Sequence, residues 1–348
     1  MKFTFTIIFL SLFFHAKAQK KRLPNYYSLI YAAEKFIIEE RLDSASVYFK
    51  KGFQKKKHPF ARHLYNAAVV DSKLRNYKNV TKYLKKLIKL GASFYQIQRN
   101  KSFLSFFSSK KGVEFIKNYR KIKPIYTQQY RNQIEKMVED DQFFRVKKGS
   151  YSTYGDTILK IDKKNIENFL SLLKELGFPS EHKIGIDTNY FPNPLYLPII
   201  IHQTMGSMQQ YDFTSILKQN VLEGNIENKA GDFMINSSSG NNFYEIVKAQ
   251  YVKLIDTTIL SINPNNIIVL DSSDWGYFPL SEKEATMINE KRKKLYLDTY
   301  EENIIKALFS LKSKEYRLSS SGANSILEFT NHSDFIDMRQ KIKIYKNK

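Results

Sequence analysis

The sequence contains no cysteine, and that absence excludes several kinds of site. Without thiols the chain forms no disulfide bond, builds no thiolate zinc or iron–sulfur centre, and carries no cysteine-linked lipid. Histidine is scarce as well. None of the six histidines lies four residues from another, and His58 and His63, five apart, face different sides of a helix. We therefore expect no metal site built from histidines alone and assign no metal-binding residues, while sites that combine histidine with carboxylates stay open.

The sequence has only 13 glycines and none of the glycine-rich motifs that bind phosphates or cofactors. It lacks the P-loop pattern, the G-x-G-x-x-G pattern of dinucleotide-binding folds and the G-x-S-x-G pattern of α/β-hydrolases. Such motifs place backbone N–H groups around a phosphate or an oxyanion. Their absence predicts a protein without a bound cofactor.

Long hydrophobic runs are absent except at the start of the chain. Phe3 to Phe14 is almost entirely apolar, Lys2 precedes it, and Ala16-Lys17-Ala18 follows as a small-x-small cleavage site. A run of about a dozen apolar residues is shorter than the roughly 20 that span a bilayer. The pattern predicts a signal peptide over residues 1–18. It also predicts a soluble periplasmic or extracellular protein with no lipid anchor and no later transmembrane segment. A buried first strand or helix is the alternative.

Positive charge is abundant but confined to one part of the chain. Residues 19–148 contain 31 Lys and Arg against 10 Asp and Glu, whereas residues 149–348 contain 23 against 24. A compositional bias toward lysine would raise its frequency everywhere. The asymmetry therefore favours an anionic partner for the first part, with the clusters Lys55-Lys56-Lys57 and Lys85-Lys86 as candidate binding residues. A solvated lysine surface without a partner is the alternative.

The basic part repeats itself at an offset of 35 residues. Tyr31–Ala33 aligns with Asn66–Ala68, and Ala45–Lys51 aligns with Val80–Lys86, so that aromatic residues, small residues and lysine pairs coincide. A period near 34 is typical of tetratricopeptide helical hairpins, in which small residues let two helices approach closely. The repeat predicts a tetratricopeptide-like helical domain over residues 19–123.

Turn and capping signals give the expected limits of these hairpins. Asp43 and Asn76 lie at the turns, where short polar side chains cap the following helix, and Gly91 is expected to end the second hairpin. Two repeats cannot bury a continuous core, so the aromatic-rich helices of residues 94–122 are expected to complete it. Pro124 marks a plausible boundary between domains.

Residues 124–348 are predicted to form a mostly helical α+β domain. The expected helices cover residues 125–145, 163–176 with Asp162 as N-cap, 199–223 ending at Gly224, and 281–311 opened by the capping box of Ser281 and Glu284. Short strands are expected at residues 267–270, 326–329 and 342–345. The fold class is therefore mainly α, with tetratricopeptide-like hairpins followed by a mostly helical α+β domain.

Residues of this second part match a set of short motifs. They are Asp141-Gln142 with Arg145, Asp162 with Asn165, Gly177-Phe178-Pro179, His202 with Gln209, Glu223-Gly224, and Asp232. With these motifs, residues 141–232 resemble an uncharacterised domain-of-unknown-function family of secreted bacterial proteins, often preceded by repeat-like helices. The chain departs from the family pattern at Ile201 and Phe233, where glutamine and arginine are usual. The resemblance implies candidate residues rather than a reaction.

Few residues are candidates for chemistry. His202, in an apolar helix beside glutamines, is a candidate general base, and a hydrogen-bonded core histidine is the alternative. Gln209, Asp141 and Asp271 complete the candidate catalytic set. Asp271 follows a predicted buried strand, where functional loops are common.

Gln142, Arg145 and Gln203 are candidate binding residues. A surface ion pair between Asp141 and Arg145 is the alternative for the arginine, because the two lie four residues apart on a helix. Together the sequence features predict an exported interaction or scaffold protein that binds an anionic protein or envelope polymer through its basic helices. An envelope hydrolase with a site around His202 is the alternative, and nucleic-acid binding is disfavoured because no recognised motif is present.

Overall fold

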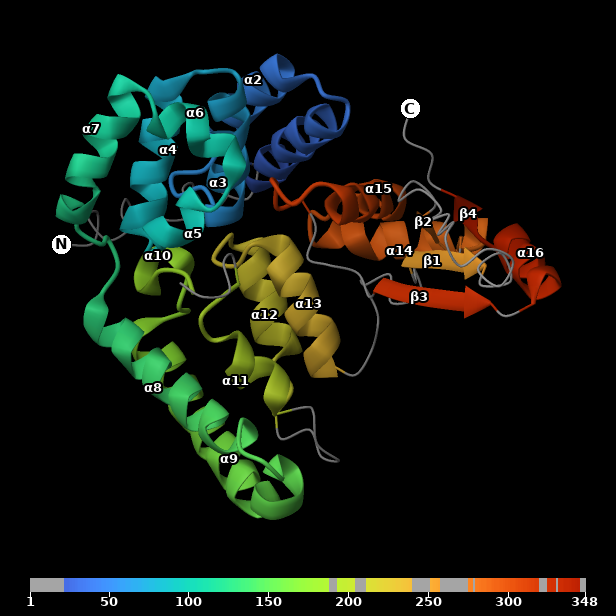
Figure 1. Cartoon of the computed structure of the whole chain (residues 1–348). Helices are drawn as coiled ribbons and strands as arrows, with labels where there is room; N and C mark the ends of the chain where they lie inside the picture. Colours follow the sequence, from blue (N-terminus) through green and yellow to red (C-terminus); the bar gives the residue numbers. More distant parts are fainter. Residues whose placement is uncertain are drawn as a thin grey trace, which may run out of the picture. The chain divides into compact units, whose positions relative to one another are not determined.

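The computed structural model describes residues 22–187, 193–203, 211–239, 251–256, 275–277, 279–318, 324–329 and 331–344. The described chain is mainly α-helical, as predicted (Figure 1). It divides into two compact units. The first unit runs up to Asn241 and also includes Leu295–Leu297, and the second unit comprises the rest.

The first unit begins with helical hairpins. They are formed by a helix of residues 22–38 followed by α2 (Leu42–Phe53), α3 (Ala61–Lys73) and α4 (Tyr77–Lys89). The alanines that align in the repeat, Ala33 and Ala68, are completely buried between the helices. The small and aromatic residues of the repeat thus form the interior, as the alignment at an offset of 35 indicated.

The turns of the two hairpins repeat the same backbone conformation. Glu40 and Arg75, 35 residues apart, both have φ of 57°. The next residue donates a backbone hydrogen bond to the helix end in each case, from Arg41 to the Phe36 carbonyl at 2.9 Å and from Asn76 to the Asp71 carbonyl at 2.8 Å. The sequence period is therefore also a structural period.

The predicted side-chain caps of these hairpins are wrong. Asp43 lies inside the first turn of α2, and Asn76 occupies the N-cap position of α4 without a side-chain capping hydrogen bond. The backbone hydrogen bonds of the left-handed turn already close each connection. Gly91, with φ of 94°, follows the end of α4 and confirms the predicted stop.

Short helices rich in aromatic residues follow the hairpins. They are α5 (Phe94–Gln98), the 3-10 turn η1 (Lys101–Phe103), α6 (Leu104–Phe107), α7 (Lys110–Asn118) and the 3-10 turn η2 (Tyr119–Lys121). Phe103, Phe106 and Phe115 are buried, whereas Leu104 and Ile116 are exposed. These aromatic side chains therefore extend the core, as expected from the sequence.

The described residues in the rest of the first unit form a long helical hairpin and four shorter helices (green to olive in Figure 1). The hairpin pairs α8 (Gln128–Arg145) with α9 (Ser150–Leu176), and the shorter helices are α10 (Glu181–Ile184), α11 (Leu197–His202), α12 (Thr214–Leu222) and α13 (Asn228–Ser239).

Two helix predictions in this region are wrong. Asp162 lies inside α9 rather than at its N-cap, because the helix begins at Ser150, directly after Gly149 with φ of 76°. The expected helix of residues 199–223 is interrupted, because residues 211–213 are not helical. Gly224, with φ of 75°, does follow the end of α12, as predicted.

Residues on both sides of Pro124 pack together within the first unit. Backbone N–H groups of Ile125 and Ile186 donate to the carbonyls of Lys89 and Leu90 at 3.0 and 2.9 Å. The principal division of the chain therefore lies near residue 241 rather than at the proline that the sequence suggested.

A buried ionic cluster forms part of the core of this unit. Arg62 of α3 donates to Glu34 of the N-terminal helix at 2.8 Å and to Glu227, just before α13, at 2.7 Å. Its guanidinium also lies 2.8 Å from Nε2 of His63, whose Nδ1 lies 2.6 Å from the Tyr26 hydroxyl. A neutral His63 fits this arrangement, with Nε2 accepting from Arg62 and Nδ1–H donating to Tyr26.

In its described residues the second unit contains a four-stranded sheet and three helices. The strands are β1 (Tyr251–Asp256), β2 (Trp275–Tyr277), β3 (Asn324–Phe329) and β4 (Lys343–Ile344), in the spatial order β3-β1-β2-β4. β1 is parallel to β3 and antiparallel to β2, and β2 is antiparallel to β4. The helices are α14 (Glu282–Lys294), α15 (Tyr300–Lys312) and α16 (His332–Lys341).

One long helix over residues 281–311 was predicted here, and two helices are present. The predicted capping box is confirmed, since the Ser281 N–H donates to Glu284 at 3.0 Å and the Glu284 N–H donates to the Ser281 hydroxyl at 3.3 Å. A second capping box, of Thr299 and Glu302, begins α15. β3 and β4 overlap the positions where strands were expected, whereas residues 267–270 lie outside the described residues.

None of the helices in the described part of the chain combines the length and the apolar character that a membrane span requires. The predicted signal peptide, residues 1–18, is outside the described residues.

Candidate functional site

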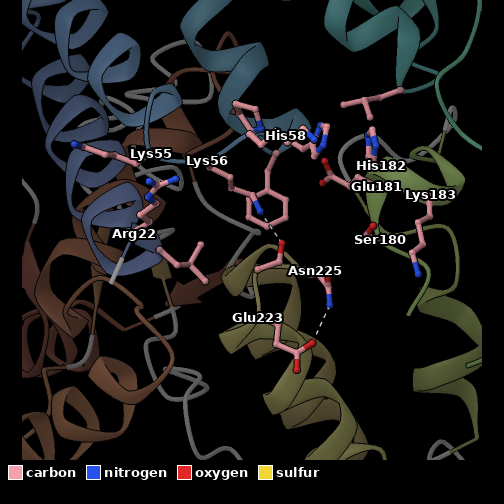
Figure 2. Close-up of a pocket in the computed structure, with 16 residues that line it drawn as sticks. Arg22, Lys55, Lys56, His58, Ser180, Glu181, His182, Lys183, Glu223 and Asn225 are labelled. Carbon is pink, nitrogen blue, oxygen red and sulfur yellow. Dashed lines mark hydrogen bonds between the residues drawn. The ribbon is translucent and has the colours of Figure 1, made fainter. Parts of the chain in front are cut away.

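A cavity of about 840 Å³ lies in the first unit, lined by charged, polar and apolar residues (Figure 2). Most of its lining comes from three segments: the connection from α2 to α3, the helix α10, and the residues after α12, with Arg22 and Leu23 of the N-terminal helix and Leu90 completing it. The α2–α3 connection ends at Pro59 and Phe60, directly before α3 begins. Gly224 ends α12 in the left-handed region and turns its carbonyl toward the cavity, where it accepts a hydrogen bond from Lys56.

Cationic side chains outnumber carboxylates around this cavity. The cationic residues are Arg22, Lys55, Lys56, Lys57 and Lys183, and the carboxylates are Glu181 and Glu223. All three lysines of the first predicted binding cluster therefore line one cavity. Concave walls with an excess of one sign of charge concentrate the field and attract the opposite charge.

Lys56 is the most constrained of these cations. Its ammonium donates to the Gly224 carbonyl at 2.7 Å and lies 4.3 Å from the centre of the Phe60 ring. Burial lowers the pKa of Lys56 to about 8, although Glu181 opposes the shift. This ammonium therefore loses its proton far more readily than an ordinary lysine.

Glu181 lies on α10 and points at the start of α3. Its Oε2 accepts a hydrogen bond of 2.7 Å from the Ala61 N–H, which satisfies one of the unpaired backbone donors of the helix. Burial raises the pKa of Glu181 to about 7, while the hydrogen bond from Ala61 acts against the shift. The carboxyl is therefore only partly ionised at neutral pH.

Two histidines from distant parts of the sequence stack in this cavity. The ring centres of His58 and His182 are 3.6 Å apart and their planes differ by 20°. Burial, together with the neighbouring His182, Lys57, Lys56 and Lys86, lowers the pKa of His58 to about 4.

Burial and Lys57 also lower the pKa of His182. Both rings are therefore neutral at pH 7. Nδ1 of His182 is buried and has no hydrogen-bond partner among the described residues.

A metal does not suit this pair. Parallel stacked rings direct their nitrogens along parallel planes rather than toward one point, and no group of three or more potential metal ligands occurs in the described ranges.

The second predicted lysine cluster lies elsewhere on the same unit. Lys85 and Lys86 of α4 line a shallower cavity of about 430 Å³. The other lysines of that cavity, Lys78, Lys82 and Lys89, come from the same helix. The structure therefore separates the two predicted clusters into two basic surfaces.

The predicted catalytic residues form a different cluster, in which His202 and Asp141 meet. Nδ1 of His202, at the end of α11, lies 2.6 Å from Oδ2 of Asp141 on α8. Arg145 donates to Asp141 Oδ1 at 2.9 Å and to both Asp162 oxygens at 2.8 Å. Gln142 donates to Asp141 at 2.7 Å.

Asp141 is 2% exposed, so the ion pair with Arg145 is buried rather than the surface pair that spacing alone suggested. Asp162 belongs to this network, which is why it has no capping role. Burial raises the pKa of Asp162 even though Arg145 lowers it. Three helices, α8, α9 and α11, thus meet at one network of charges.

The other predicted residues are separate from it. Gln203 is buried, and its amide group donates to the Tyr211 carbonyl at 2.6 Å and accepts from the Tyr211 N–H at 2.9 Å. It joins the two ends of the segment between α11 and α12. Gln209 and Asp271 lie outside the described residues.

Sequence reasoning missed Glu181, His182 and Arg22. His182 was considered only as a possible metal ligand, and no motif links α10 to the lysines of the α2–α3 connection. A comparison of the chain with protein-family models, with curated proteins and with solved structures finds no match.

Proposed function

We propose that this protein is an anion-binding interaction protein whose basic cavity captures an acidic group of its partner. The observation that carries the proposal is the charge of the cavity, where five cationic side chains and two neutral imidazoles face two carboxylates. Lys55 and Lys57 are exposed, and no ion pair among the described residues holds either. Their ammonium groups are available to an incoming anion.

Binding of dextran sulfate, a polyanion that offers negative charge but no specific recognition motif, tests this proposal. The double variant Lys55→Glu/Lys57→Glu should bind labelled dextran sulfate much more weakly than the parent, as measured by fluorescence anisotropy at low salt. High salt should weaken binding by the parent, because exposed charges are screened over about 8–10 Å at physiological ionic strength.

The matched control is Lys110→Glu/Lys111→Glu, which makes the same change of charge on exposed lysines of α7. This control should retain most of the binding. Equal losses in the two double variants would show that binding follows net charge alone, and the proposal would then be wrong.

Export is part of this proposal. The Phe3–Phe14 run and the Ala16-Lys17-Ala18 site support removal of residues 1–18 and a location outside the inner membrane. The intact mass of protein purified from the periplasm or medium should correspond to a chain that begins at Gln19. A mass that includes Met1 would contradict export through this signal.

A second candidate function, hydrolysis at His202, is favoured by one observation. The 2.6 Å contact with the buried Asp141 fixes the imidazole with Nδ1 toward the carboxylate, and this orientation leaves Nε2 to exchange a proton. This network contains four residues of the motifs that resemble the secreted family: Asp141, Arg145, Asp162 and His202. The resemblance itself remains a prediction.

Turnover of nitrophenyl ester, phosphate and glycoside substrates tests the second candidate. Parent activity that disappears in His202→Ala while the melting temperature is retained would support it. A structural histidine predicts the opposite: no activity to lose, and a free energy of unfolding lowered by roughly 1–3 kcal/mol because the buried Asp141 loses a partner.

A further inference from the structure

The paired imidazoles and the lysines around them restrict what kind of anion fits the cavity. Figure 2 shows His58 and His182 side by side, with Lys56 and Glu181 directed into the same space. Lys55, Lys56 and Lys57 directly precede His58 in the chain, and Lys56 is fixed by the Gly224 carbonyl. Neutral ring nitrogens, ammonium groups and a partly protonated carboxyl thus face one volume.

We propose that the cavity binds the phosphate group of a phosphorylated small molecule between these lysines and the imidazoles of His58 and His182, and that a proton is taken up on binding. This inference rests on the anion-binding function proposed above and names its ligand class.

Burial and neighbouring cations make the protonated forms of two groups in this cavity less favourable. The pKa of His58 is lowered by burial and by His182, Lys57, Lys56 and Lys86, and the pKa of Lys56 is lowered by burial. A dianion bound here would take the place of the water that His58 and Lys56 lose on burial, and its charge would offset the repulsion between the cations. Each of these groups would then bind a proton more strongly.

The other charged groups around the cavity either add positive charge or already have a hydrogen-bond partner. Arg22 from the N-terminal helix and Lys86 from α4 add positive charge. Lys183 of α10 donates to the Leu176 carbonyl at 2.7 Å, and Glu223 accepts from Gln219 at 2.9 Å. Glu181, with a pKa of about 7, would be protonated beside a bound anion rather than repel it.

Phosphate fits this set of groups better than a carboxylate or a sulfate. A phosphate monoester has a second pKa near 6, so it accepts from ammonium groups and also shares a proton with a neutral imidazole. Nδ1 of His182, buried without a partner among the described residues, is the nitrogen that such a proton would satisfy. A sulfate ester has no proton to share.

The cavity is also larger than a phosphate ion needs. Its 840 Å³ lies within the range of sites for small organic ligands, about 300–1,000 Å³. Leu23, Phe60 and Leu90 provide apolar surface beside the charged groups. An organic group attached to the phosphate would contact this apolar surface, which is why phenyl phosphate is a suitable probe.

Calorimetry with the full chain tests the inference. Phenyl phosphate should bind about tenfold more tightly than benzoate, as expected for one or two additional charge-assisted hydrogen bonds. Heats measured near neutral pH in two buffers of different ionisation enthalpy should reveal net proton uptake. Equal affinity for the two ligands, or the absence of proton uptake, would overturn the inference.

His182→Phe is the diagnostic variant, because it keeps a ring that stacks on His58 and removes the ring nitrogens. It should lose the preference for phenyl phosphate but still bind dextran sulfate, while Lys110→Glu/Lys111→Glu should retain both. A preserved preference in His182→Phe would contradict the assignment.

Histidine NMR of the parent provides a measurement that needs no variant to fold. Addition of phenyl phosphate should raise the pKa values of two imidazoles, and unchanged values would count against the inference. If phenyl phosphate does not bind while dextran sulfate binds normally, only the proposed ligand class is disproved. Failure of both would disprove the anion-binding function.

Discussion

Arg62 carries its charge into the core of the first unit, where it lies between the carboxylates of Glu34 and Glu227. Both arginine–carboxylate contacts are shorter than 2.9 Å, and the three side chains are at most 7% exposed. Burial by itself raises the pKa of Glu227, but the attraction of Arg62 and its hydrogen bond hold that pKa well below its usual range. The cluster joins the N-terminal helix, α3 and the start of α13.

Removal of the Arg62 charge should be strongly destabilising. Arg62→Met leaves two buried carboxylates without their counterion, and a broken buried ion pair typically costs about 3–5 kcal/mol of unfolding free energy. Arg99→Met, at an exposed position directly after α5, should change it by less than about 0.5 kcal/mol. Urea unfolding measures both, and similar losses would mean that the buried cluster contributes little.

Two groups of the first unit should shift stability with pH in opposite directions. Burial and Arg62 lower the pKa of His63 to about 4. The neutral histidine therefore makes its full contribution to the unfolding free energy above about pH 6.5, and this contribution is lost as the pH falls through 4. Burial raises the pKa of Glu181 to about 7, so its stabilisation is complete below about pH 4.3 and is lost as the pH rises through 7.

Glu181→Gln isolates the second effect, because glutamine cannot ionise. Relative to the parent, the variant should gain unfolding free energy as the pH rises from about 5 to about 8. Parallel urea titrations at the two pH values measure this difference. A constant difference between parent and variant would show that Glu181 titrates normally in the folded state.

At the scale of elements, the two N-terminal hairpins use the same left-handed turn 35 residues apart. Glu40 and Arg75 both have φ of 57°, a region where a side chain costs about 1–2 kcal/mol relative to ordinary helical backbone. The backbone hydrogen bonds donated by Arg41 and Asn76 stabilise the two turns nevertheless. The connection is fixed by backbone geometry and not by a capping side chain.

Glycine at either turn should therefore stabilise the protein. Glu40→Gly and Arg75→Gly relieve the left-handed strain, and each should raise the unfolding free energy by up to ~1 kcal/mol after the larger entropy of the unfolded glycine is allowed for. Lys35→Gly, at an exposed position inside the N-terminal helix, should lower it by about 1 kcal/mol. Destabilisation by all three variants would refute the interpretation of strain at the turns.

At the scale of the whole molecule, the basic repeats do not form a compact unit by themselves. Thr127 donates to the Lys183 carbonyl at 2.9 Å, Ile186 donates to the Leu90 carbonyl at 2.9 Å, and Glu227 supplies the counterion of Arg62. Contacts from residues beyond 148 therefore complete the core of the basic part. The charge asymmetry of the sequence coincides with a surface of the first unit and not with a separate domain.

Two fragments should differ accordingly. Residues 19–241 should give a cooperative thermal transition by circular dichroism, because the fragment keeps the Arg62–Glu227 pair and the cavity. Residues 19–148 should melt at a lower temperature or without cooperativity, since the fragment exposes apolar surface and leaves Arg62 with a single carboxylate. Equally stable fragments would indicate that the first part folds independently.

Local signals in the sequence were sufficient for much of the helical framework. The register of small and aromatic residues at an offset of 35 indicated the hairpins, Gly91 and Gly224 ended their helices, and Ser281 with Glu284 opened α14. The helix stops and the capping box depend on residues within one or two turns of each other, which is the range over which capping acts, whereas the repeat is visible because its two copies share one pattern. The lysines of residues 55–57 were also identified, since their charge is evident from composition.

Contacts across the chain were decided only by the tertiary structure. The stacking of His58 on His182, the capping of α3 by Glu181 and the pairing of Arg145 with Asp162 each join helices that no local pattern connects. The sequence around Asp162 suited a helix N-cap. The free energy gained from its ion pair with the buried Arg145 and from the longer α9 was larger than the gain from a cap at Asp162. The sequence by itself indicated the N-terminal hairpins, several helix ends and where charge accumulates. Which side chains share the cavity depended on packing, because burial of apolar faces selects the neighbours of each helix without regard to distance along the chain.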